Sequence, residues 1–124
     1  MEVDLGALVR NAKAVASRSG VPIIPMIKAD AYGLGAVEVA RALEPLAPLA
    51  YGVATVAEGE ELRTAGIARQ ILIFTPLLRA EFEAAHRSNL TPTLGSRAEI
   101  EAWSRIGGPY TLSIDTGMAR AGIP

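Results

Sequence analysis

The chain has 124 residues, 50% of them hydrophobic and 20% charged, with a formal net charge of −1 and no cysteine. This composition suits one folded domain; it excludes a disordered chain, disulfides and thiolate metal sites, and it offers no basic patch to nucleic acid or to an anionic membrane. Because the amino terminus lacks a signal-peptide pattern and no apolar run approaches the roughly 20 residues that span a bilayer, we expect a soluble, cytoplasmic protein.

Two hydrophobic periodicities alternate along the chain. Apolar residues at helical spacing predict a helix from Leu5 that ends at Gly20, and the apolar run over 21–27 then predicts a buried strand. The alternation continues with predicted helices over 36–46, 55–66, 76–87 and 96–107 and predicted strands over 51–55, 70–74, 90–94 and 110–114. Thr55–Glu58 and Ser96–Glu99 have the form of capping boxes, so both should begin helices.

Repeated strand–helix units predict an α/β fold with parallel strands joined by short loops. Two architectures fit this pattern: a doubly wound open sheet, or part of a (β/α)₈ TIM-type barrel. About five strands and 124 residues fall short of the roughly 250 residues that a full barrel takes. Since no helix or cap ends the chain at Pro124, we expect residues 1–124 to be a single, truncated domain. Either architecture would place chemistry at the carboxyl ends of the strands.

Lys28 directly follows the first predicted strand, at its carboxyl end. Partial burial there would disfavour the charged form of the amine, and a neutral amine can form a Schiff base with a carbonyl. A lysine in this position can equally lay its stem along the strand end and keep its ammonium in water. Position alone leaves both roles open.

A glycine-containing loop, Ala29–Gly35, follows Lys28. Gly33 and Gly35 allow positive φ and close approach of the backbone, and the helix that follows begins where an anion is favoured. Tyr32 could donate its hydroxyl to a phosphate. The loop lacks the third glycine of a dinucleotide fingerprint and the Gly-Lys-Ser/Thr of a P-loop, so it can equally be a plain strand-to-helix turn.

A second polar segment, Asp115–Arg120, lies at the carboxyl end of the last predicted strand. Arg120 could bind an acidic oxygen on a ligand, or be an ordinary solvated arginine. Asp115-Thr-Gly117 is also similar to the catalytic loop of retroviral-type aspartic proteases, but those proteins are nearly all β and this chain has at least four predicted helices. His86, the one histidine, fits a surface position near a helix end, and no group of residues has the pattern of a metal site.

Taken together, these segments resemble the N-terminal domain of alanine racemases. The match that identifies the family is Met26-Ile-Lys-Ala-Asp-Ala-Tyr-Gly-Leu-Gly35, which is similar to its cofactor-lysine signature almost residue for residue. Supporting matches follow in family order at 4–8, 51–55, 61–66, 70–74, 90–94 and 114–120. The resemblance implies a fold-type III pyridoxal-phosphate enzyme that interconverts L- and D-alanine and so supplies D-alanine for the cell wall.

The resemblance also implies roles for three residues. Lys28 would bind pyridoxal 5′-phosphate covalently and act as one of two bases on the substrate Cα. Tyr32 would hydrogen-bond the cofactor phosphate, and Arg120 would donate towards the cofactor's ring system. The second base, a tyrosine, would come from the C-terminal domain of a partner subunit. The resemblance therefore implies a homodimer, and the chain alone should be inactive.

Two departures from the family pattern keep alternatives open. Ser113 stands where many members have a lysine, often carbamylated, that steadies the arginine. The rest of the barrel and the C-terminal β-domain have no counterpart in the chain. The chain could therefore be the N-terminal part of an alanine racemase, part of another fold-type III protein such as a serine racemase or a pyridoxal-phosphate carrier, or a non-catalytic half-barrel that needs a partner chain.

Overall fold

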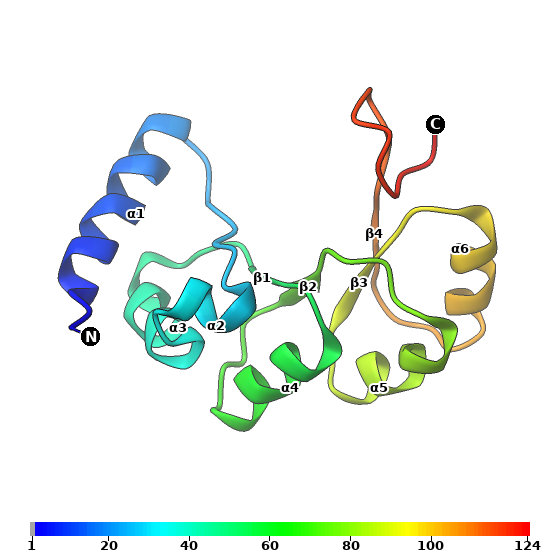
Figure 1. The fold of residues 1–124 in the computed structure, drawn as a ribbon, viewed down its shortest axis with the longest axis horizontal. Helices are drawn as coiled ribbons and strands as arrows, with labels where there is room; N and C mark the ends of the chain where they lie inside the picture. The colour runs from blue at the N-terminus through cyan, green and yellow to red at the C-terminus, as the bar shows by residue number, and fades with distance from the viewer. Residues whose placement is uncertain (1) are drawn as a thin grey trace.

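The computed structural model describes residues 2–124 as a curved parallel sheet with helices along its outer side (Figure 1). The strands, in the order that they take in the sheet, are β1 (Tyr51–Val53), β2 (Ile71–Ile73), β3 (Thr91–Leu94) and β4 (Thr111–Leu112). All three neighbouring pairs are parallel, which confirms the expected α/β fold. Strands in chain order with helices on one side are typical of a barrel rather than a doubly wound sheet. The sheet does not close on itself within residues 2–124.

The predicted helices occur in the predicted order, and one further short helical segment, α2 (Lys28–Gly33), lies where the sequence predicted a loop. In chain order the helices are α1 (Leu5–Ser19), α2 (Lys28–Gly33), α3 (Ala36–Leu43), α4 (Val56–Thr64), α5 (Phe82–Arg87) and α6 (Arg97–Ser104), with short 3₁₀ turns η1 (Glu44–Leu46) and η2 (Arg79–Glu81). Within residues 2–124, none of them combines the length and the apolar character that a membrane-spanning helix needs. The capping box predicted at Thr55–Glu58 begins α4 as expected. At α6, Ser96 caps the helix, but the Glu99 carboxylate accepts from Gly95.

The prediction of a regular strand over 21–27 is wrong. The segment pairs with β1 through one isolated bridge, Met26↔Gly52, in which Gly52 N–H donates to Pro25 O at 2.9 Å and Ile27 N–H donates to Gly52 O at 2.8 Å. Pro22 and Pro25 have no N–H, so a continuous ladder cannot form. The segment nevertheless occupies the place of a first barrel strand beside β1.

The predicted helix over 76–87 begins later than expected. Leu78 is extended, with φ −69° and ψ 147°, and its N–H donates to the Glu81 carboxylate at 2.8 Å. Only then do η2 and α5 follow. The segment from Pro76 to Leu78 is therefore a connection from the carboxyl end of β2, not the first turn of a helix.

The hydrophobic core lies between the sheet and its outer helices. In α3, Ala36, Val39, Ala40 and Leu43 recur at helical spacing and are all buried. The Tyr51 hydroxyl, on buried strand β1, donates to the Ala40 carbonyl at 2.7 Å. Packing of this kind fixes the helices against the sheet and leaves the carboxyl ends of the strands to the loops.

Arg63 binds the loops at the amino end of the sheet. Its guanidinium donates to four backbone carbonyl groups at distances of 2.6–3.2 Å, those of Ile67, Arg69, Ser88 and Asn89. Burial lowers the pKa of Arg63. Since Ile67–Arg69 leads into β2 and Ser88–Asn89 into β3, one side chain holds the entries of two neighbouring strands together.

We expect Arg63→Lys to lower the free energy of unfolding by about 2–3 kcal/mol, because an ammonium cannot reach four carbonyl groups that lie in different directions. Urea denaturation with an unchanged m value would measure this loss. Arg97→Lys is the control, since Arg97 is 92% exposed in its ion pair with Glu101 and should change stability by less than about 0.5 kcal/mol. Equal effects of the two substitutions would contradict the structural role of Arg63.

Candidate active site

The residues after Lys28 form a left-handed turn. Ala29, Asp30, Ala31 and Tyr32 have φ between 50° and 57°. The positive φ values expected for the glycines are confirmed, at 83° for Gly33 and 90° for Gly35, but the four residues before them were not predicted to share this conformation. It costs an L-residue roughly 1–2 kcal/mol, so the surrounding structure must hold this turn in place.

Hydrogen bonds at both ends stabilise the turn. Ala31 N–H donates to Ile27 O at 2.9 Å, and Gly35 N–H donates to Asp30 O at 3.0 Å. The Asp30 carboxylate accepts from Ala36 N–H at 2.7 Å, at the start of α3. Asp30 thus ties the turn to the next helix, a role that sequence reasoning missed although aspartate tolerates left-handed backbone better than most residues.

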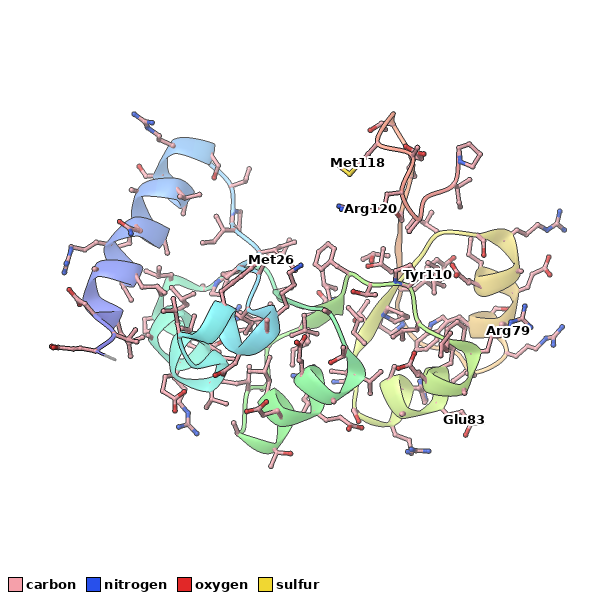
Figure 2. The ribbon with its side chains drawn as sticks, viewed as in Figure 1. Met26, Arg79, Glu83, Tyr110, Met118 and Arg120 are labelled. Carbon is pink, nitrogen blue, oxygen red and sulfur yellow. The ribbon has the colours of Figure 1, made fainter. Side chains whose placement is uncertain are left out.

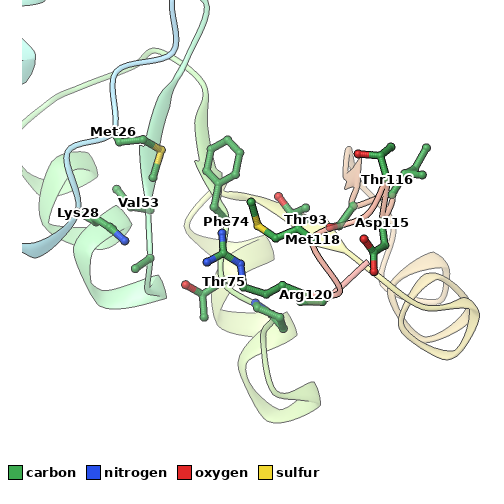
Figure 3. A pocket seen from close by; sticks show the side chains of 15 residues that line it. Met26, Lys28, Val53, Phe74, Thr75, Thr93, Asp115, Thr116, Met118 and Arg120 are labelled. Carbon is green, nitrogen blue, oxygen red and sulfur yellow. The ribbon is translucent and has the colours of Figure 1, made fainter. Parts of the chain in front are cut away.

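A cavity of about 600 Å³ opens at the carboxyl ends of the strands. Lys28 lines it on one side and Arg120 on the other, and in Figure 3 the amine of Lys28 and the guanidinium of Arg120 point towards the space between them. Neither cation has an ion-pair partner within the part of the chain that the structure describes. Tyr32, by contrast, does not line this cavity, and it is 65% exposed.

The loop that carries Arg120 is held by its own polar groups. The Asp115 carboxylate accepts from the N–H groups of Gly117 and Ala119, both at 2.9 Å, and these bonds lower the pKa of Asp115. The ends of the loop are joined, since Asp115 N–H donates to Ile123 O and Ile123 N–H donates to Ser113 O, both at 2.8 Å. Figure 2 shows Arg120 extending from this loop towards the side of the molecule where Met26 lies. Asp115 therefore orders the loop, and the α/β fold contradicts the aspartic-protease alternative.

Backbone strain concentrates around the two cations. Eight non-glycine residues in the described range have positive φ. Four of them follow Lys28 directly, and two more, Ala119 at 55° and Ala121 at 46°, flank Arg120. Conformations of this kind persist only where neighbouring contacts enforce them, and they cluster at functional sites. The distribution makes the segments that carry Lys28 and Arg120 the candidates for a functional site.

The cavity has the chemistry to bind an anionic carbonyl compound. It offers one primary amine and one guanidinium, and the hydroxyl-bearing Thr75, Thr93 and Ser113 also line it. Its one acidic side chain, Asp115, already accepts two backbone hydrogen bonds. Among residues 2–124, no group of three histidine, cysteine, aspartate or glutamate side chains is placed to hold a metal ion.

The family described as "Alanine racemase, N-terminal domain" matches residues 3–124. The alanine racemase of Aquifex aeolicus is 36% identical over 124 residues, covering 99% of this chain and 37% of that protein. The alanine racemase of Geobacter sulfurreducens is 38% identical over 131 residues, covering 99% of this chain and 34% of that protein. The chain thus spans little more than a third of the length of these relatives.

Solved structures give the same result for the fold. An alanine racemase of Clostridium difficile 630 matches 94% of this chain and 33% of its own length, with a TM-score of 0.85 and 33% identity. An alanine racemase of Bartonella henselae with covalently bound pyridoxal phosphate matches 98% of this chain and 36% of its own length, with a TM-score of 0.89 and 27% identity. The open parallel sheet therefore matches part of the N-terminal barrel of these proteins.

The order of the Arg120 loop should depend on the charge of Asp115. Since its backbone bonds lower the pKa of Asp115 in the folded chain, the stabilisation is present at neutral pH and is lost as the pH falls through this depressed pKa. An NMR titration should show the amide protons of Gly117 and Ala119 shifting together, at a pH below the ordinary range for aspartate. Asp115→Asn should abolish this pH-dependent shift, while Asp4→Asn, which alters the cap of α1, should leave it unchanged. If the pH-dependent shift of these amide protons survives in Asp115→Asn, another titrating group must cause it.

Proposed function

This chain belongs to the alanine racemase N-terminal domain family, and on that premise we propose that residues 1–124 form the cofactor-binding barrel segment of a pyridoxal-phosphate-dependent alanine racemase. The observation that carries the proposal is the placement of two cations, Lys28 and Arg120, across one cavity at the carboxyl ends of the strands, neither of them ion-paired within residues 2–124. The proposal includes a cytoplasmic role in supplying D-alanine for the cell wall, as the family resemblance implies.

The residues present fit pyridoxal phosphate. The cofactor is an anion that carries an aldehyde, and the cavity offers an amine for the aldehyde and a guanidinium as a hydrogen-bond donor. A volume of about 600 Å³ lies within the usual range for a small-molecule site. The covalently bound pyridoxal phosphate of the Bartonella henselae relative supports the same cofactor here.

When bound, the cofactor withdraws electrons from the substrate Cα and so makes loss of the Cα proton easier. In the proposed mechanism Lys28 holds the cofactor in the resting protein, and as a free amine its Nζ takes a proton from one face of Cα or returns it there. The left-handed turn supports this double role, because it fixes the backbone beside Lys28 and leaves only the side chain to move.

Arg120 and Tyr32 are proposed to bind the cofactor from two sides. The Arg120 guanidinium, which lines the cavity, would donate to the ring system, and the exposed Tyr32 hydroxyl would donate to the phosphate. Ser113 lines the cavity too. The family resemblance implies a lysine at this position in many members. Arg120 would therefore be steadied by the loop that Asp115 orders rather than by a charged neighbour at 113.

Racemisation needs a base on each face of Cα, and Lys28 supplies one of them. We propose that the second base comes from a C-terminal domain outside residues 1–124, contributed by the partner in a homodimer. The structure leaves apolar surface for such a partner, because Ile114 and Met118, which line the cavity after β4, are exposed.

Lys28 and Lys13 are the two lysines of residues 1–124, so within this segment the attachment site has a single alternative. When the full-length protein is loaded with pyridoxal phosphate and reduced with borohydride, peptide mapping should find the label on Lys28. Lys28→Ala should lose the label and the interconversion of L- and D-alanine, because both the anchor and one base are removed. A coupled D-amino-acid assay would measure the activity.

Lys13→Ala is the matched control, since Lys13 is an exposed residue of α1, and it should keep both the label and the activity. Label on Lys13 or on any other lysine of the full-length protein in place of Lys28, or racemisation that survives in Lys28→Ala, would overturn the assignment. Faster exchange of serine than of alanine would point to a related racemase with another substrate.

The proposed phosphate contact of Tyr32 can be tested by removing one oxygen. Tyr32→Phe should weaken cofactor binding by roughly ten- to a hundredfold, because a hydrogen bond to a charged group contributes about 1.5–3 kcal/mol. Equilibrium titration of the cofactor-free protein would give the affinity. Tyr110→Phe, at a tyrosine that precedes β4 and does not line the cavity, should have no effect. Equal affinities for the two variants would exclude the contact.

A further inference from the structure

Glu58 is the third residue of α4 and belongs to the capping box that begins this helix. Its Oε2 atom accepts from Ala54 N–H at 2.7 Å and from Thr55 N–H at 3.3 Å. The Thr55 hydroxyl in return accepts from Glu58 N–H at 3.2 Å. These bonds complete the ordinary task of a glutamate at this position.

The second oxygen of Glu58 leaves its own helix. Oε1 accepts from Ala29 N–H at 2.9 Å, from a residue 29 positions earlier in the chain. Ala29 directly follows Lys28 and is the first left-handed residue of the turn, with φ 50°. One half-buried carboxylate therefore joins the backbone beside Lys28 to the backbone at the carboxyl end of β1.

The two segments that Glu58 joins contribute residues to the cavity lining, whereas Glu58 itself does not line the cavity. Lys28, Val53 and Ala54 all line the cavity. Glu58 binds the backbone of Ala29, next to Lys28, and the backbone of Ala54, next to Val53. Hydrogen bonds from N–H groups to a carboxylate are roughly twice as strong as neutral ones. Ala29 begins the turn in a left-handed conformation that an alanine normally avoids. The Glu58 carboxylate that accepts from its N–H therefore helps to fix the orientation of the backbone at this point.

Two other glutamates occupy similar capping positions, and they show what is particular to Glu58. Glu81 accepts from Leu78 N–H at 2.8 Å, and Glu99 accepts from Gly95 N–H at 2.7 Å. Within residues 2–124, the carboxylates of both bind only the start of their own helix. The contact from Glu58 to Ala29 is therefore not a by-product of helix capping.

We propose that Glu58 is a positioning residue for Lys28: its carboxylate fixes the backbone from which the amine enters the cavity. Glu58 itself contacts neither cofactor nor substrate. The inference rests on the proposed function, since that function gives Lys28 its ligand. It predicts that Glu58 affects covalent attachment at Lys28 more than it affects the contacts made by the phosphate and the ring.

Two ligands separate these effects in the cofactor-free full-length protein. Pyridoxal 5′-phosphate carries the aldehyde that bonds to an amine, whereas pyridoxine 5′-phosphate carries an alcohol instead and cannot form this bond. Glu58→Gln, which keeps the shape but loses the charge and one acceptor, should weaken binding of the aldehyde about tenfold and slow its borohydride-trapped attachment to Lys28. Binding of the alcohol should change by less than about twofold, and Glu81→Gln should change neither.

The other possible outcomes would overturn either the positioning role of Glu58 or the proposed function. Unchanged attachment in Glu58→Gln would overturn the positioning role. Equal weakening of both ligands would overturn it as well, because it would show that Glu58 supports the fold as a whole. Failure of the wild-type protein to attach the aldehyde at Lys28 would instead overturn the proposed function.

Discussion

The left-handed turn after Lys28 is the constraint on which the site depends. Four non-glycine residues there adopt a conformation that L-residues avoid, at roughly 1–2 kcal/mol each. The turn persists because contacts with other segments hold it at both ends: the Glu58 carboxylate accepts from Ala29 N–H, and the turn's own Asp30 carboxylate accepts from Ala36 N–H at the start of α3. A turn enforced in this way leaves the backbone little freedom, so the direction of the Lys28 side chain is set by the fold and not by the chain's local preferences.

The cations at the two ends of the sheet have different surroundings. At the amino end, Arg63 joins the entries to β2 and β3, and Arg69 forms a two-point ion pair with Glu44 at 3.0 and 3.1 Å while also donating to Pro48 O. At the carboxyl end, the cations of Lys28 and Arg120 have no such partners within the described residues and face the cavity. Parallel βα units make this separation possible, because all their strands end at the same edge.

Gly52 on β1 makes room for two side chains that line the cavity. A Cβ atom at Gly52 would overlap the Met26 sulfur and lie 2.9 Å from the Phe74 ring, so glycine leaves room for these two side chains over β1. Met26 and Phe74 both line the cavity. The single bridge between Met26 and Gly52 is thus enough to place Lys28 beside β1 although two prolines interrupt the strand.

Periodicity, capping residues and a family signature are local properties of the chain. They were enough to predict the alternation of strands and helices, the capping box of α4 and the candidate residues Lys28 and Arg120. The sequence predicted positive φ at Gly33 and Gly35 for the same reason. It could not predict that Ala29 to Tyr32 share this conformation, that Asp115 orders the Arg120 loop, or that Glu58 reaches the turn beside Lys28. Those features depend on hydrogen bonds and packing between segments, and only the tertiary structure brings these partners together and offsets the strain that the local sequence would avoid.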